Sequence, residues 1–142
     1  MRPRRTFLAM AIGATMSLGL GISACGSDGG SGPNTNVLVA SWNATSFTAL
    51  GQDFIANGMG LVLTLNQGGT YSIAVTGDQG DLICSPGPTC TQTGDYSSTS
   101  TVLTFDPGTP DAVSFNWSLQ GTTLTLTGSI SGNTATMVLQ KL

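Results

Sequence analysis

The sequence Val113-Ser-Phe-Asn-Trp-Ser-Leu119 decides the fold, because apolar and polar residues alternate along its whole length. Side chains of a β-strand point alternately to opposite faces, so this pattern predicts a strand with one buried face and one solvated face. Residues 120–122 predict a turn, and residues 123–130 predict a second strand with Leu124 and Leu126 facing inward. The stretch therefore predicts an antiparallel hairpin with one apolar face.

Similar short segments lie on both sides of this hairpin. We expect further strands at residues 37–47, 61–65, 70–76, 94–97, 99–105 and 134–142, and a long loop at 77–93. No helical segment of crossover length separates the strands, and the connections are mostly short. Consecutive antiparallel strands of this number tend to close, since closure removes exposed edges. The sequence therefore predicts an all-β fold, a small antiparallel up-and-down barrel of about eight strands.

The first residues predict a secretory signal. Arg2, Arg4 and Arg5 precede an uncharged apolar segment of about 16 residues, which is shorter than the roughly 20 that span a bilayer. Ile22-Ser23-Ala24-Cys25 resembles the lipobox of bacterial lipoprotein precursors. The resemblance implies cleavage between Ala24 and Cys25 and acylation of Cys25, which would anchor the mature protein to a membrane. An ordinary signal peptide is the alternative.

This resemblance gives three regions: a helical lipoprotein signal peptide at 1–24, the lipidated Cys25 with a flexible tether at 25–36, and the barrel at 37–142. It places the protein in the bacterial cell envelope. Gly26 and Ser27 follow the cysteine without an Asp directly after it, which favours the outer membrane over the inner membrane. Arg4-Arg5 also resembles a twin-arginine export signal, and general secretion is the alternative route.

The charge of the chain excludes several classes of function. After residue 24 the only basic residue is Lys141, against seven Asp, so the cationic face that nucleic-acid binding needs is absent. The chain has no His and no Glu, and its serines lack a general base. Asp78 and Asp81, like Asp106 and Asp111, lie in predicted turns, where Asp is common. We therefore expect no enzyme, no cofactor and no metal site, with calcium at these turns as the alternative.

Cys84 and Cys90 flank the sequence Ser-Pro-Gly-Pro-Thr. Outside the cytoplasm such a pair oxidises, and the two prolines and the glycine bend the chain back. We predict a structural disulfide that contributes roughly 2 kcal/mol in the chain-entropy model. The alternative, a redox or metal site, lacks further ligands.

Four patterns carry a second resemblance: Ala40-Ser-Trp42, Gly69-Thr-Tyr-Ser72, Gly94-Asp-Tyr-Ser97, and the hairpin from Trp117 to Leu126. Together they resemble bacterial lipocalin-like lipoproteins. The family has Gly-x-Trp in its first strand, where this chain has Ala40, and an Arg near the end that packs on the Trp. With no Arg in the mature chain, Lys141 is the candidate to close the barrel over Trp42.

The barrel interior is the candidate binding site. The candidate cavity residues are inward-facing aromatic and apolar side chains, namely Trp42, Tyr71, Ile73, Leu103, Phe105, Phe115, Trp117 and Met137. Leu50, Phe54 and Ile55, in one helical turn of segment 50–60, are the candidate lid. We expect a membrane-anchored lipoprotein that binds a small apolar ligand without catalysis. The alternative is a protein-interaction, inhibitor or structural lipoprotein with a filled core, contacting an envelope protein through the 84–90 loop.

Overall fold

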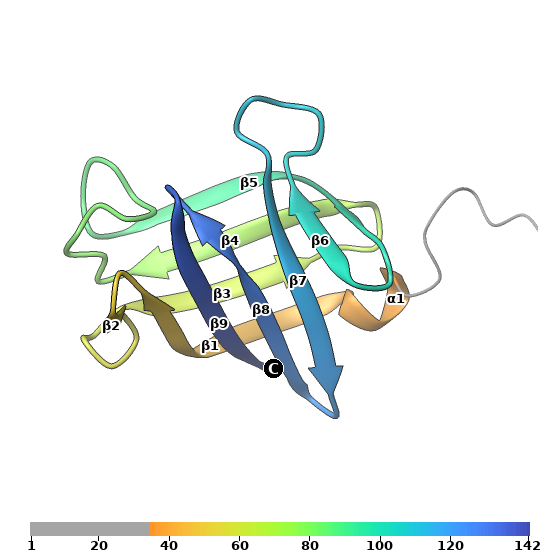
Figure 1. The fold of residues 1–142 in the computed structure, drawn as a ribbon, viewed down its shortest axis with the longest axis horizontal. Helices are drawn as coiled ribbons and strands as arrows, with labels where there is room; N and C mark the ends of the chain where they lie inside the picture. The colour runs from red at the N-terminus through yellow and green to blue at the C-terminus, as the bar shows by residue number, and fades with distance from the viewer. Residues whose placement is uncertain (1–34) are drawn as a thin grey trace, which may run out of the picture.

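The computed structural model describes residues 35–142 (Figure 1). The predicted signal peptide, the lipobox with Cys25 and the tether up to residue 34 lie outside the described residues.

One short helix and nine strands follow each other along the described chain. They are α1 (Thr35–Leu38), β1 (Ala40–Ala49), β2 (Gln52–Asp53), β3 (Gly60–Leu65), β4 (Thr70–Thr76), β5 (Cys90–Ser98), β6 (Val102–Phe105), β7 (Val113–Gln120), β8 (Thr123–Ile130) and β9 (Asn133–Lys141). No helix in this part of the chain is long and apolar enough to span a bilayer.

The strands form a closed antiparallel barrel. β1 pairs with β3, each strand from β3 onward pairs with the next one in sequence, and β9 pairs back with β1. The short strand β2 pairs only with the end of β1 and stands outside this ring. The predicted up-and-down barrel of about eight strands is confirmed, and the register is set by alternating apolar residues.

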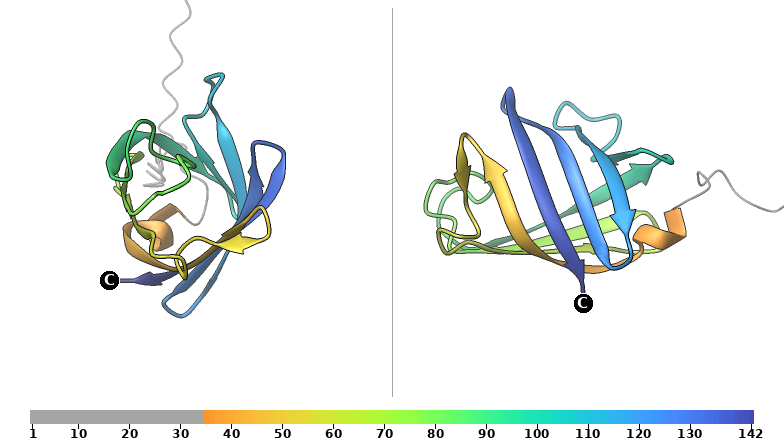
Figure 2. Two further views of the ribbon diagram at one scale, coloured as in Figure 1. Left: turned by 90° about the vertical axis from the view of Figure 1, so that its left-hand side faces the viewer. Right: turned by 60° about the horizontal axis from the view of Figure 1, so that its bottom comes forward.

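The two ends of the barrel differ, because alternate connections of a meander fall at the same end. Short turns and α1 lie at one end, which we call the α1 end. The opposite end carries the longer connections at 50–59, 77–89 and 106–112. Seen from this end, the loop 77–89 lies across part of the opening (Figure 2, left view).

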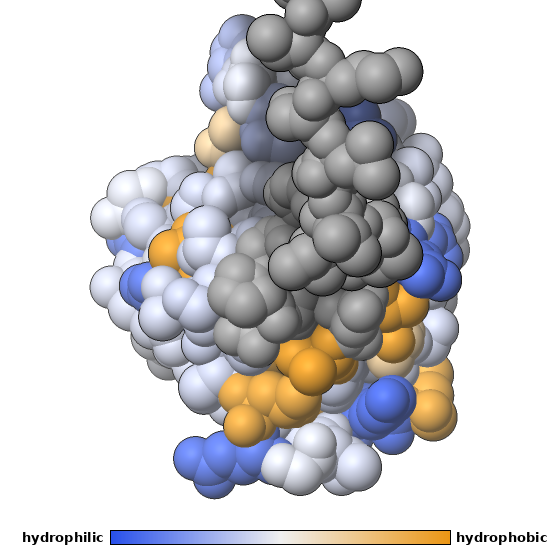
Figure 3. Space-filling model, turned by 90° about the vertical axis from the view of Figure 1, so that its right-hand side faces the viewer, coloured by the Kyte–Doolittle hydropathy of each residue, from blue (hydrophilic) through white to orange (hydrophobic). Residues whose placement is uncertain are grey.

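The α1 end is filled by side chains. Leu38 of α1 and Trp42 of β1 are fully buried, and the Trp42 indole N–H donates to the Leu38 carbonyl at 2.9 Å. The strand predicted at residues 37–47 begins later than expected. Residues 37 and 38 belong to α1, and strand pairing starts at Ala40. Figure 3 looks at this end and shows apolar surface in its lower part.

A β-bulge in β1 changes which residues face the core. The pairing with β9 shifts between Ala44 and Ser46, so two residues oppose one on the partner strand. Before the bulge Trp42 and Ala44 are buried, and after it the buried residues are Phe47 and Ala49. Trp42 was among the predicted inward-facing residues and Phe47 was not, because the bulge brings Phe47 into the interior.

Candidate ligand-binding cavity

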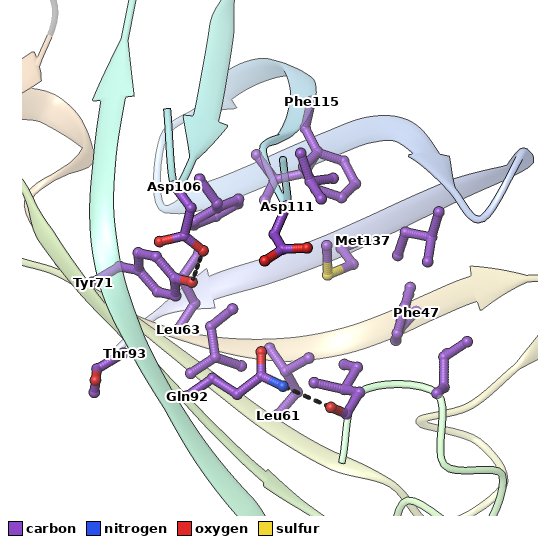
Figure 4. Close-up of a pocket in the computed structure, with 17 residues that line it drawn as sticks. Phe47, Leu61, Leu63, Tyr71, Gln92, Thr93, Asp106, Asp111, Phe115 and Met137 are labelled. Carbon is purple, nitrogen blue, oxygen red and sulfur yellow. Dashed lines mark hydrogen bonds between the residues drawn. The ribbon is translucent and has the colours of Figure 1, made fainter. Parts of the chain in front are cut away.

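The barrel holds a cavity of about 570 Å³ that is partly open to solvent, and this volume is within the range of roughly 300–1,000 Å³ that is usual for small-molecule sites. Most of the lining is apolar, and its polar residues come from β4, β5 and the 106–112 loop (Figure 4). The lining residues are Phe47, Leu61, Leu63, Tyr71, Ile73, Leu82, Ile83, Gln92, Thr93, Phe105, Asp106, Asp111, Val113, Phe115, Leu126, Ile130 and Met137.

Three aromatic rings form one wall of the cavity. Tyr71 of β4 and Phe105 of β6 meet edge to face, with ring centroids 4.8 Å apart. Phe105 meets Phe115 of β7 in the same manner at 6.1 Å. Such edge-to-face contacts are favourable beyond the buried area, so they stabilise this apolar wall.

The Tyr71 hydroxyl gives this wall a polar end. It donates a hydrogen bond of 2.8 Å to Oδ2 of Asp106, which follows β6 (Figure 4). Burial raises the pKa of Tyr71 to about 12, and the hydrogen bond and negative charge of Asp106 add to the shift. The phenol therefore stays protonated and fixes one carboxylate at the cavity.

Gly94 makes room for this pair. It lies opposite Tyr71 in the β4–β5 ladder. A Cβ atom at this position would lie 2.8 Å from Tyr71 Cε1 and would overlap Asp106 Oδ1. The glycine is thus required by close approach of the ring and the carboxylate.

The loop 77–89 covers the cavity with Leu82 and Ile83, which both line it. The loop folds around the buried carboxylate of Asp78. Its Oδ1 accepts from the Leu82 N–H at 3.1 Å, and its Oδ2 accepts from the N–H groups of Ile83 at 2.7 Å and Cys84 at 2.8 Å. Burial raises the pKa of Asp78, but the backbone donors of Cys84, Ile83 and Leu82 outweigh this, so the pKa lies below its usual value.

Two further contacts hold this loop over the barrel. The Gln92 amide of β5 donates to the Ile83 carbonyl at 2.6 Å. Cys84 and Cys90 form the predicted disulfide, with Cα atoms 5.6 Å apart, and it ties the middle of the loop to the start of β5. The disulfide prediction is confirmed, and its place in the fold makes it part of the cover.

Five predicted cavity residues line the observed cavity together: Tyr71, Ile73, Phe105, Phe115 and Met137. The other three do not line it. Trp42 and Leu103 are fully buried. Trp117 is partly buried, and its indole N–H donates to the Thr99 carbonyl in the β5–β6 turn at 3.0 Å.

The predicted lid segment lies elsewhere. Leu50 is 57% exposed, and none of Leu50, Phe54 and Ile55 lines the cavity. Phe54 packs on Phe47, with ring centroids 5.6 Å apart. The segment turns around Asp53, which accepts from Ser46 and three backbone N–H groups. The hydrogen bond from the Ser46 hydroxyl is the main reason why the pKa of Asp53 is lowered. The structure thus places the loop 77–89, not segment 50–60, against the cavity.

Trp42 and Lys141 are directly opposite each other in the β1–β9 ladder. The Trp42 ring is buried under α1, while Lys141 is exposed. The Trp42 hydrogen bond to Leu38 shows that α1 covers this tryptophan at the α1 end.

The residues of the cover and most of the polar lining residues were not identified from the sequence. Leu82 and Ile83 are an apolar pair inside an otherwise polar loop, and this pair was the available signal. Gln92 and Thr93 were placed in the predicted loop 77–93. They belong to β5, which starts at Cys90 and not at residue 94. Asp106 and Asp111 were interpreted only as turn residues.

Comparison of the chain with protein-family models, curated proteins and solved structures finds no match in any of the three. The fold and the cavity therefore carry the argument about function. A closed β-barrel with an apolar interior can exclude water from a small ligand and hold it by shape.

Proposed function

We propose that this protein is a membrane-anchored envelope lipoprotein whose barrel binds a small apolar ligand without catalysing a reaction. The cavity of about 570 Å³ is the observation that carries the proposal. A core that served only stability would be closely packed, because protein interiors leave few voids larger than a water molecule. This barrel instead keeps an apolar space under a loop with its own anchoring contacts.

The chemistry of the chain supports a binder over an enzyme. The chain has no His and no Glu to act as a general base near neutral pH. The carboxylate of Asp106 accepts from Tyr71, and that of Asp78 is occupied by backbone N–H groups. These groups organise the site and its cover.

The alternative, an interaction or structural lipoprotein with a filled core, is less well supported. The disulfide loop is the best-defined surface for a protein partner. The two apolar residues directly before it, Leu82 and Ile83, line the cavity and do not add to an outward patch. The loop 77–89 thus contributes the hydrophobic area of Leu82 and Ile83 to the interior of the barrel.

The position of the anchor is compatible with the arrangement of the two ends of the barrel. The described chain begins at the α1 end, and the cavity cover lies at the opposite end. From Cys25 to Thr35 a fully extended chain spans at most roughly 35 Å. Acylation at Cys25 would tether the barrel by its α1 end, and a tether of this length leaves the cover at the opposite end accessible.

Two variants test ligand binding. Ile73 lines the cavity, whereas Ala74, its neighbour on β4, is exposed on the outer face. Calorimetric titration with decan-1-ol should show saturable binding to the wild type and to Ala74→Trp, and none to Ile73→Trp. Equal binding by both variants would contradict a site in the barrel, as would no binding by the wild type. Native mass spectrometry of the purified protein should recover a bound apolar compound.

A separate variant tests the anchor. Cys25→Ser removes the acylated thiol and should move the protein from the membrane fraction to the soluble fraction of cells. Cys84→Ser is the matched control, because it changes a cysteine of the barrel and should leave the membrane fraction unchanged. Membrane attachment that survives Cys25→Ser would contradict the anchor.

A further inference from the structure

The polar part of the cavity lining carries negative charge alone. Tyr71, Gln92 and Thr93 are neutral, and the two ionisable residues that remain are Asp106 and Asp111. The lining includes no Lys, Arg or His. An apolar ligand whose polar end reaches this region meets carboxylates and no balancing cation.

The two carboxylates differ in how they are held. Asp106 is fixed by the Tyr71 hydroxyl at 2.8 Å. Asp111 is exposed, and among residues 35–142 no side chain or backbone group donates a hydrogen bond to its carboxylate. Figure 4 shows the Asp111 carboxylate pointing into the cavity between Asp106 and Met137. Asp111 is therefore the group with free acceptors, and Asp106 is a second fixed charge beside it.

The surrounding chain does not offset these charges. The single basic residue after residue 24 is Lys141, and it lies opposite Trp42 in the β1–β9 ladder. Lys141 does not line the cavity, and the C-terminus next to it lies across the barrel from the 106–112 loop (Figures 1 and 2). The polar part of the cavity lining therefore carries a net negative charge.

We propose that the cavity selects a cationic amphiphile, an apolar chain that ends in a protonated amine, over a fatty acid or another anionic lipid. This rests on the proposed function. The chain would occupy the apolar space between Leu61, Leu126 and Met137, and its ammonium group would donate to Asp111. A carboxylate head in the same position would face two like charges, which disfavours it strongly.

Three probes of equal chain length test this selection on the purified mature protein: decylamine, decan-1-ol and decanoate. Calorimetric titration at neutral pH should give an affinity for decylamine about three- to tenfold above that for decan-1-ol, and weakest binding for decanoate. The advantage of the amine should shrink as ionic strength rises, because salt screens exposed charges.

Asp111→Asn keeps the size of the side chain and removes its charge. It should lower decylamine affinity toward that of decan-1-ol and raise decanoate affinity. Asp95→Asn is the matched control, since Asp95 is exposed on β5 and does not line the cavity. It should change none of the three affinities.

The outcomes separate the two proposals. Decanoate that binds as tightly as decylamine would overturn the charge selection and leave the apolar site intact. An equal effect of Asp95→Asn and Asp111→Asn would also overturn it. Absence of binding by all three probes would contradict the proposed function itself.

Discussion

Asp78 organises the loop that covers the cavity, and Asp78→Asn tests this role directly. In the structure one carboxylate oxygen accepts from Leu82, and the other accepts from both Ile83 and Cys84. An Asn side chain has one oxygen and an NH2 group that cannot accept. If the amide oxygen keeps the pair of bonds at Ile83 and Cys84, the NH2 group faces the Leu82 N–H, and that bond is lost.

The magnitude follows from the charge of the acceptor. A hydrogen bond to a charged group contributes about 1.5–3 kcal/mol. At about 1.4 kcal/mol per factor of ten, its loss should speed exchange of the Leu82 amide roughly 10- to 150-fold. Ile83 and Cys84 should exchange faster by a smaller factor, because their acceptor becomes neutral.

Hydrogen exchange followed by NMR measures each of these amides. Asp81→Asn is the control, because Asp81 lies in the same loop, is exposed and has a positive φ that Asn tolerates. It should leave the three amides unchanged, and amides of the β8–β9 ladder should change little in either variant. Unchanged exchange at Leu82 in Asp78→Asn would refute the reasoning, as would an equal rise in the control.

Three other predictions concern the cavity wall and the cover. Gly94→Ala should lower the free energy of unfolding by about 1–3 kcal/mol, since the new Cβ atom would lie 2.8 Å from Tyr71 Cε1, whereas Gly68→Ala should be nearly neutral because nothing lies within 4 Å of that position. Replacing both Cys84 and Cys90 by Ala should cost about 2 kcal/mol in chemical denaturation and speed release of a bound probe, because the cover loses its tie to β5. The pKa of Tyr71 is raised from 10.0 to about 12, so the contribution of the protonated phenol to stability is complete below pH 10 and is lost as pH rises toward 12. The wild type should therefore lose more free energy of unfolding than Tyr71→Phe over this interval. Equal losses would contradict the raised pKa of Tyr71.

Much of the barrel could be predicted because its strands alternate cleanly. The predicted bounds 70–76 and 123–130 are those of β4 and β8. The alternation around Phe115 correctly indicates its buried face. Each of these strands has one face in the core and one in water, so binary pattern and register agree.

The errors occur where a local feature breaks this period. The bulge between Ala44 and Ser46 reverses the inward face of β1, and the sequence around it gives no distinct signal for the extra residue. Residues 37 and 38 continue the apolar pattern of β1, yet they belong to α1, where Leu38 accepts the Trp42 bond. Here tertiary contacts outweigh the local pattern.

The cavity was harder to predict than the barrel. Its walls come from alternating strands, and five of these residues followed from the pattern alone. Its cover comes from a loop without periodicity, whose position depends on the buried Asp78 and on Gln92. Such contacts join residues by three-dimensional fit, and spacing along the chain does not reveal them.

Methyl NMR of the protein titrated with decan-1-ol tests the central claim, a ligand site inside the barrel, most directly. The account predicts saturable shifts at one equivalent for the cavity methyl groups of Ile73, Ile83 and Leu126. The methyl groups of Val62 and Val138, which do not line the cavity, should remain unchanged. Shifts confined to Val62 and Val138, or no saturable shift at Ile73, Ile83 and Leu126, would contradict a binding site in the barrel.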